Sequence, residues 1–410
     1  MIDRDRLSAR VEELEPELDA LVADLVAIDS QIPPYADERA VVAHLRQQGE
    51  ARGLGAGEVM AAAPERPNLV LRVDGNPDGR RLGLCGHVDT KPVGDAAHLW
   101  RTDPLVATEI DGMLYGLGTS DMKAAVAAMV IAAQACVEAG ITEHGSLELA
   151  LVADEEAGAQ FGSKWLAPQL THWDGCLIGE PSGWERDWQG LHLVSRGLSC
   201  FRITVLGTQR HSSLSDRLPA VNASMQLATL MSRMPSDLVI THPSQQFDDL
   251  RPTVNPGVMI NGGVYYGVVP GEAMFACDIR AVPGMTLESL TEDLHAWLER
   301  AEQELGIEAR LEFEPDLTWI DPSVIAADDP LVVAAQDGCA RVLADPPPLS
   351  FFPGTTDAPW FSAAGVPTIP SLGPGILTYC HGPNEAVSVE SVRQAAHLYA
   401  HTIVSYLGGA

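Results

Sequence analysis

An apolar run in the middle of the chain, Leu149 to Ala153, leads directly into three consecutive carboxylates, Asp154, Glu155 and Glu156. The run predicts a buried strand that ends where the acidic residues begin. Three like charges at the end of a buried strand are unfavourable, because their mutual repulsion raises the cost of desolvating each of them. A bound cation would remove that cost. A divalent metal ion at this strand end would also make the cluster a catalytic site.

Strand-like and helical runs alternate on both sides of this strand. Such alternation predicts a layered α/β fold, a sheet with helices on both faces. Leucine and valine at helical spacing predict that the chain opens with one surface helix. The expected strands cover residues 68–73, 81–85, 147–153, 175–178 and 368–371, and the expected helices cover residues 7–26, 122–138, 331–343 and 391–407.

The pattern changes near residue 194, where short alternating strands replace the fully apolar ones. A chain of 410 residues exceeds what one hydrophobic core usually serves. We therefore expect a first domain made of residues 1–193 and 313–410, interrupted by a small α+β domain at 194–312. Within the insert, strands are expected at 198–206, 258–260, 273–279 and 308–313, and helices at 220–231 and 287–305.

Composition excludes several classes of protein. A formal net charge of −30 argues against nucleic acid or an anionic membrane as a partner. Seven scattered cysteines without a CxxC pair argue against a disulfide framework and a zinc ribbon. We expect no signal segment and no apolar run of membrane-spanning length, and therefore a cytoplasmic protein.

Candidate metal ligands recur where strands are expected to end, and ligands of open α/β sheets gather at the carboxyl ends of strands. Each has an ordinary interpretation alone: a histidine at a strand end is commonly a hydrogen-bonded surface residue, and an aspartate before a helix commonly caps it. Their joint occurrence in one order favours a shared crevice. Asp89 is expected to hold the second ring nitrogen of His87. The candidate ligands and their acidic neighbour are His87, Asp121, Glu155, Glu156, Glu180 and His381.

Six ordered motifs resemble the M20 family of metallopeptidases and deacylases over nearly the whole chain. This family includes acetylornithine deacetylase, succinyl-diaminopimelate desuccinylase, aminoacylase and glutamate carboxypeptidase. The motifs are Gly86-His87-Val88-Asp89-Thr90, Gly116-Leu117-Gly118-Thr119-Ser120-Asp121-Met122-Lys123, Asp154-Glu155-Glu156, Gly179-Glu180-Pro181-Ser182, Gly207-Thr208-Gln209-Arg210-His211-Ser212-Ser213 and Cys380-His381-Gly382-Pro383-Asn384-Glu385.

The resemblance implies a zinc-peptidase-like catalytic domain with two zinc ions that share Asp121. One ion would also take His87 and Glu180, and the other Glu156 and His381. Cobalt or manganese would suit the same ligands. Two metals would lower the pKa of a water molecule and polarise the scissile carbonyl. Glu155 would act as general base and pass the proton to the leaving nitrogen.

By the same resemblance, the insert would be a lid and dimerisation domain. His211 would stabilise the oxyanion, often at the partner subunit's active site, and Arg280 would grip a substrate carboxylate. Gly354 and Thr355 resemble the family's substrate loop. A turn histidine, a salt-bridged arginine and a plain loop are the ordinary alternatives. The chain departs from the family at Gly267-Val268-Val269-Pro270, where asparagine is usual first, and at Ser195-Arg196-Gly197 and Lys91, where the family has Lys-Gly and an apolar residue.

These residues predict an amidohydrolase that removes the acyl group of a small N-acyl amino acid. Glu180, rather than aspartate, is similar to the deacylase and carboxypeptidase members. A carboxypeptidase or dipeptidase acting on short peptides is the alternative, and a phosphoesterase or a metal-binding protein without activity are less well supported. A homodimer formed through the insert is expected. The acyl group, the side chain and the physiological metal stay open.

Overall fold

The computed structural model describes residues 2–408, and these form two compact units. The first unit holds the described residues up to Ser195, together with Ser323–Phe352 and those from Thr356 onward. The second unit holds Arg196–Pro322 and Pro353–Thr355. The second unit thus continues to Pro322 instead of ending at residue 312. Hydrogen bonds between its strand residues and the segment 314–320, from Glu314 to Cys200 and between Leu198 and Ile320, keep that segment with the second unit.

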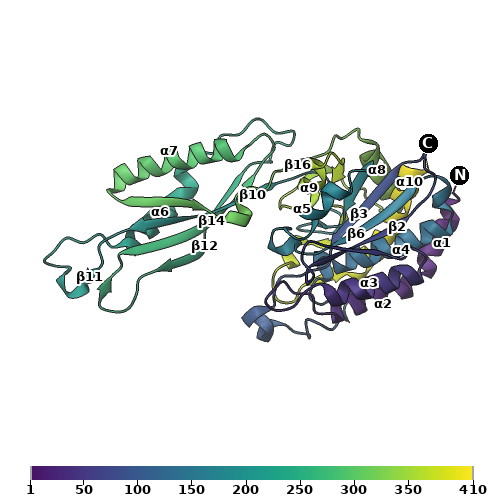
Figure 1. Cartoon of the computed structure of the whole chain (residues 1–410), viewed down its shortest axis with the longest axis horizontal. Helices are drawn as coiled ribbons and strands as arrows, with labels where there is room; N and C mark the ends of the chain where they lie inside the picture. The colour runs from purple at the N-terminus through teal and green to yellow at the C-terminus, as the bar shows by residue number, and fades with distance from the viewer. Residues whose placement is uncertain (1, 409–410) are drawn as a thin grey trace. The chain divides into compact units, whose positions relative to one another are not determined.

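The first unit is built on a six-stranded mixed sheet (Figure 1). Four neighbouring strands are parallel, so they end at the same edge. The strands in spatial order are β1 (Glu58–Ala61), β2 (Pro67–Val73), β6 (Ser146–Val152), β3 (Arg81–His87), β7 (Gly175–Ile178) and β18 (Thr368–Ile369). Residues of β3 and β6 are buried on both faces, which explains their nearly continuous apolar sequence. The expected strand positions agree with this sheet to within a few residues.

Helices cover both faces of the sheet, as the alternating pattern predicts. On one face lie α4 (Ala124–Glu138) and α10 (Val389–Leu407), which contact β3 and each other. The other face packs against α5 (Ser163–Leu166) and α9 (Ala358–Ala363) through an apolar cluster that includes Val152 and Phe361. The remaining helices of this unit are α1 (Arg4–Glu13), α2 (Glu15–Ala27), α3 (Arg39–Ala51) and α8 (Pro330–Val342).

Two expectations for the helices need correction. The opening helix is divided at Leu14 into α1 and α2, because Pro16 occupies the first turn of α2 and has no N–H to continue the helix before it. In the described part of the chain, one helical stretch, Thr119–Glu138, is long and apolar enough to cross a membrane, although none was expected. It is 94% buried within the protein, so it is a core helix.

The second unit contains a four-stranded antiparallel sheet and two helices. The strand order is β12 (Thr253–Gly262), β14 (Glu272–Ala281), β10 (Gly197–Leu206) and β15 (Glu308–Phe313). Burial alternates along β10, so one face of the sheet is covered. The helices α6 (Ala223–Asp237) and α7 (Leu287–Leu305) pack on this sheet. A two-stranded antiparallel sheet, β11 (Arg210–His211) with β13 (Val268–Val269), completes the unit.

Short strands in the first unit complete the described structure. They form three small sheets beside the main one: β16 (Ser323–Val324), β9 (Leu191–Ser195) and β17 (Leu349–Phe352); β19 (Gly373–Ile376) with β8 (Pro181–Gly183); and β20 (Ala386–Ser388), β5 (Met113–Tyr115) and β4 (Thr108–Ile110). None of these strands was predicted from the sequence, because runs of two to five residues carry too little periodicity.

Candidate metal centre

Three strand ends deliver acidic and histidine side chains to one edge of the main sheet. His87 is the last residue of β3 and pairs in register with Val152, the last residue of β6. Glu155 and Glu156 form a short turn directly after β6, and Glu180 follows β7. Because β3, β6 and β7 are parallel, these side chains meet at the carboxyl end of the sheet.

Asp121 reaches the same edge from a kinked segment before α4. Gly118 opens this segment with φ of 78°, a conformation that favours glycine, and a Cβ there would lie 2.7 Å from Thr90 Cγ2. The Glu385 carboxylate accepts hydrogen bonds from the backbone N–H groups of Gly118, Ser120 and Asp121, at 2.9, 2.9 and 3.0 Å. Asp121 does not cap α4 through its side chain, so the ordinary interpretation of this residue is not the one observed.

The side chains form two three-residue clusters that share Asp121. The first contains His87, Asp121 and Glu180, and the second contains Asp121, Glu156 and His381; within each, the candidate ligand atoms lie within 4.8 Å of one another. His87 Nε2 lies 2.8 Å from Asp121 Oδ1 and 3.5 Å from Glu180 Oε1. His381 Nε2 lies 3.1 Å from both Asp121 Oδ2 and Glu156 Oε2.

The donor set of each cluster fits a divalent metal ion. His87 Nδ1 donates to the backbone oxygen of Asp89 at 3.0 Å, so in the neutral ring the Nε2 lone pair faces two carboxylate oxygens. Three electron-rich atoms then converge with no donor between them. Histidine nitrogen and carboxylate oxygen are both zinc ligands, and a catalytic zinc ion usually has three protein ligands. A cation between these atoms would satisfy all three.

The pKa values of His87 and His381 also indicate that the neighbouring carboxylates require a positive charge. Burial lowers the pKa of His87, but its hydrogen bond to Asp121 and the charge of Glu180 hold that pKa well above its ordinary value. Burial also lowers the pKa of His381, but its hydrogen bonds to Asp121 and Glu156 raise that pKa to about 10. Without a metal ion, protons on the two histidines therefore supply the charge that the carboxylates require.

Asp89 contacts the second ring nitrogen of His87, as expected, and does so through its main chain. His87 Nδ1 lies 3.0 Å from the main-chain oxygen of Asp89, and the nearer carboxylate oxygen is 3.7 Å away. The Asp89 carboxylate instead accepts hydrogen bonds from the backbone N–H groups of Glu155 and Glu156, at 3.3 and 3.1 Å. Asp89 therefore fixes both the imidazole and the acidic turn.

A network of buried ion pairs, which was not predicted from the sequence, also holds the acidic turn at Asp154 to Glu156. Asp154 has φ of 67°, and its Oδ1 lies 2.9 Å from Arg66 Nη2. Arg66 makes a bidentate pair with Glu38, at 2.6 and 2.8 Å. All three side chains are buried. Because the three residues are far apart in the sequence, no local pattern indicates this network.

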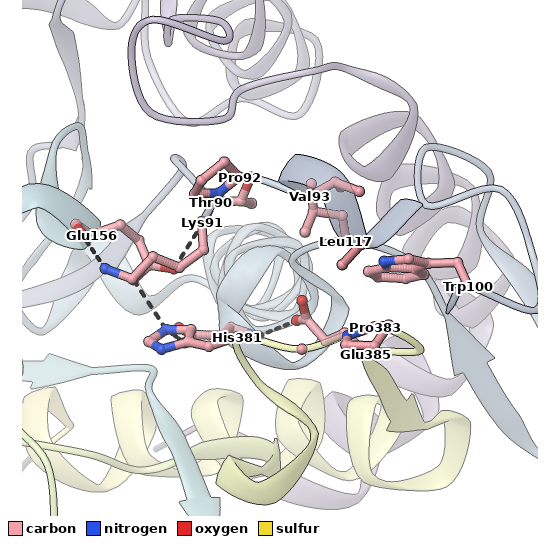
Figure 2. Close-up of a pocket in the computed structure, with 13 residues that line it drawn as sticks. Thr90, Lys91, Pro92, Val93, Trp100, Leu117, Glu156, His381, Pro383 and Glu385 are labelled. Carbon is pink, nitrogen blue, oxygen red and sulfur yellow. Dashed lines mark hydrogen bonds and ion pairs between the residues drawn. The ribbon is translucent and has the colours of Figure 1, made fainter. Parts of the chain in front are cut away.

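A cavity of about 180 Å³ lies beside the second cluster (Figure 2). Glu156 and His381 lie at one end, and Trp100 and Pro383 at the other. The Lys91 ammonium reaches Glu156, where Nζ lies 3.2 Å from Oε2 and also contacts the main-chain oxygen. Burial opposes the charge on Lys91, but the carboxylates of Glu156 and Glu155 raise its pKa, so the amine is an ammonium ion.

The other predicted site residues belong to the second unit. Arg280 Nη1 donates to Thr355 Oγ1 at 3.1 Å, so the structure brings these two residues together, with Gly354 next in the chain. His211 is exposed on the two-stranded sheet of β11 and β13. Its Nδ1 accepts from the backbone N–H of Ser213 at 3.2 Å, which leaves Nε2 as the protonated nitrogen of the neutral ring.

The fold and the two clusters define a class of hydrolase with a metal centre at the carboxyl edge of the sheet. The family model described as peptidase family M20/M25/M40 matches residues 83–405, and the chain belongs to this family. It is therefore a hydrolase of amide bonds that uses divalent metal. The resemblance inferred from the six motifs is confirmed.

Individual members of the family with similar sequences or structures can also be named. The chain is 30% identical to a succinyl-diaminopimelate desuccinylase of Leptothrix cholodnii, over 95% of this chain and 98% of the relative. A desuccinylase of Alkalilimnicola ehrlichii is 31% identical, over 79% and 84% of the two chains. Among solved structures, the dipeptidase Dug1p of Saccharomyces cerevisiae has a TM-score of 0.80 at 15% identity, with 99% of each chain covered. The M20 metallo-carboxypeptidase Sso-CP2 of Sulfolobus solfataricus has a TM-score of 0.77 at 17% identity, covering 96% and 100%. These structures confirm the fold class.

Proposed function

We propose that this protein is a dinuclear zinc amidohydrolase that removes the acyl group from an N-acyl amino acid. The observation that carries the proposal is the pair of ligand clusters that share Asp121, with Glu155 directly beside a member of one of them. His87, Asp121 and Glu180 would hold one ion, and Asp121, Glu156 and His381 the other. Zinc is favoured by the histidine–carboxylate ligands, and cobalt or manganese would substitute.

The two ions would supply Lewis acidity toward the scissile carbonyl and a water molecule of lowered pKa. Glu155 is the general base in this proposal. Its side chain is half-buried, and its backbone N–H is held by the Asp89 carboxylate at 3.3 Å. Burial, and then the neighbouring carboxylates, raise the pKa of Glu155 well above its ordinary value. A carboxylate beside the proposed metal ligands is suited to take a proton from water and return it to the leaving nitrogen.

The second unit would contribute substrate contacts. Arg280 offers a planar guanidinium that suits a bidentate contact with a substrate carboxylate, and Thr355 lies beside it. The loop at Gly354 would provide backbone contacts to the same substrate. His211 would use its Nε2–H as a donor to the oxyanion that develops during attack, at its own or a partner subunit's site.

The substrate is proposed from the relatives. Curated relatives spanning nearly the whole chain are named succinyl-diaminopimelate desuccinylases, which favours a small N-acyl amino acid. Carboxypeptidase or dipeptidase activity on short peptides is the second candidate, because solved neighbours include a dipeptidase and a carboxypeptidase. We place the enzyme in the cytoplasm, since all seven of its cysteines are free thiols in the described structure.

A homodimer through the second unit is also part of the proposal. Strand β12 lies at the edge of its sheet and exposes Val258, Met259 and Ile260, which are 54%, 61% and 60% accessible. Tyr265 and Tyr266 follow at 80% and 92%. An exposed apolar edge strand is a surface that proteins usually cover. Sedimentation velocity that shows a fully active monomer would contradict the dimer.

The experiment is a panel of N-acyl amino acids and dipeptides assayed with zinc, cobalt or manganese. We expect turnover of N-acyl amino acids that disappears with a chelator and returns with metal. Glu155→Gln should lower kcat by about 10²- to 10⁴-fold, as expected for loss of a general base. Glu185→Gln changes an exposed glutamate of the same unit and serves as the control. Unchanged turnover in Glu155→Gln would refute the assigned base, and preference for dipeptides would favour the second candidate.

A further inference from the structure

The two ligand clusters differ in the charges that surround them. The members of the first cluster, His87, Asp121 and Glu180, are all buried. Within residues 2–408, the ion-pair partners of these three residues are histidines and carboxylates alone. The second cluster is more open, because the His381 side chain is 51% accessible. It also has a lysine beside it, since the ammonium of Lys91 forms an ion pair with Glu156.

Lys91 reaches the oxygen of Glu156 that faces the second cluster. Figure 2 shows Lys91, Glu156 and His381 together at one end of the cavity. Glu156 Oε2 lies 3.2 Å from Lys91 Nζ and 3.1 Å from His381 Nε2. The other oxygen, Oε1, accepts a hydrogen bond from the backbone N–H of Lys91 at 3.2 Å. The ammonium is therefore bound to the oxygen that a metal ion in this cluster would need.

An ammonium and a metal ion compete for this oxygen. A metal ion bound to Oε2 would lie a few ångströms from Nζ, and two positive charges at that separation repel each other. The ammonium also compensates the charge of Glu156, which weakens the attraction of this carboxylate for a metal ion. The Lys91 side chain is 35% accessible, so it has room to turn toward solvent when a metal ion binds.

Glu156 does not need the ammonium to keep its orientation. The backbone N–H of Lys91 donates to Oε1, and the Asp89 carboxylate accepts from the backbone N–H of Glu156 at 3.1 Å. A neutral side chain of similar length at position 91 would remove the charge and leave both contacts. Such a variant separates two roles of the ammonium. If it competes, its removal tightens binding of the second ion, and if it supports Glu156, its removal weakens that binding.

We propose that Lys91 is a built-in competitor of the second metal ion and makes that ion the exchangeable one. In the absence of metal the ammonium holds Glu156, and it leaves Oε2 when the free metal concentration is high enough for the second ion to bind. The inference rests on the proposed dinuclear centre. It adds a form of regulation to that centre, because occupancy of the second site then follows the free concentration of zinc.

The test is titration of metal-free protein with zinc at pH 7, measured by calorimetry and by competition with a chelator. Lys91→Met removes the ammonium and Lys91→Arg keeps a positive charge. Lys164→Met is the matched control, because it removes an exposed lysine from the same unit. We expect Lys91→Met to lower the Kd of the second zinc ion by about 10- to 100-fold, the size of effect usual for a residue next to a metal ligand. The Kd of the first ion should not change, and the other two variants should bind zinc like the wild type.

A Kd of the second ion that is unchanged or higher in Lys91→Met, with the first ion bound normally, would overturn the proposal. If Lys91→Met misfolds and loses the first ion as well, acetylation of the wild-type lysines, read by mass spectrometry, decides. Lys91 should react faster relative to Lys164 after the second equivalent of zinc than after the first. An equal rate would overturn the competition.

Failure of the proposed function would give a different result. A protein that binds zinc as predicted but hydrolyses no N-acyl amino acid or dipeptide would refute the amidohydrolase, and the Kd values would still support the competition. If the wild type binds a single ion, a second ion that appears in Lys91→Met would support the proposal. Absence of a second ion from both proteins would overturn it.

Discussion

Arg66 lies between two buried carboxylates, and its replacement tests how the acidic turn is held. Its side chain is 8% accessible and pairs with Glu38 at 2.6 Å and with Asp154 at 2.9 Å. Asp154 directly precedes the proposed base, Glu155. Arg66→Met would leave two carboxylates buried, with side chains 0% and 3% accessible, and without the cation that compensates them.

The magnitude follows from the burial of these charges. Removing one partner of a buried ion pair costs about 3–5 kcal/mol, because the charge that remains is uncompensated. We expect Arg66→Met to lower the free energy of unfolding of the first unit by that amount. Adding Glu38→Gln to Arg66→Met should recover part of the loss, since the amide removes one uncompensated charge.

Urea unfolding followed by tryptophan fluorescence measures this effect. Most tryptophans of the chain belong to the first unit, so the signal reports on that unit. Arg341→Met is the control, because Arg341 is 45% accessible and its pair with Asp337 is worth less than about 1 kcal/mol. A loss in Arg66→Met no larger than that of the control, or a further loss on adding Glu38→Gln, would refute the reasoning.

Three further predictions concern the same unit. Glu385→Gln should weaken metal binding by about 10- to 100-fold, because three N–H groups of the Asp121 segment lose their anionic acceptor. Competition with a chelator measures this affinity, and an unchanged affinity would contradict the role of Glu385. Removal of metal should lower Tm and readdition restore it, since bound metal stabilises only the folded state; an identical Tm would argue against a site formed by folding. Burial lowers the pKa of His192 to about 4, below its ordinary value near 6.5. The folded state therefore binds fewer protons in this interval, and stability from His192 is present above about pH 6.5 and lost as the pH falls toward 4, by up to about 3 kcal/mol. Comparing urea midpoints at pH 7 and 4.5 in wild type and His192→Gln checks this: the variant should lose less stability on acidification, and an equal loss would contradict it.

The layered fold and the convergence of the strand ends were predictable from sequence, for a physical reason. Buried parallel strands require continuous apolar runs, so β3, β6 and β7 stand out from their surroundings. Their carboxyl ends must share one edge, which places His87, Glu156 and Glu180 together without any knowledge of the register. The spacing of the long helices was equally readable.

Contacts made by main-chain atoms or across long sequence separations were not predictable. Asp89 was expected to hold His87, but the sequence did not indicate that its backbone oxygen makes this contact while its carboxylate binds the acidic turn. The pairing of Arg66 with Asp154 depends on tertiary structure alone. The extent of the second unit also depended on hydrogen bonds after β15, in a segment with no strand pattern.

The central claim is that Asp121 is shared by two metal sites. The most direct test is the zinc content of equilibrated protein, measured by mass spectrometry in wild type, Asp121→Ala and His381→Ala. We predict two zinc ions per wild-type chain, one in His381→Ala, and loss of tight binding at both sites in Asp121→Ala. A single ion in the wild type, or two ions retained in Asp121→Ala, would contradict the account.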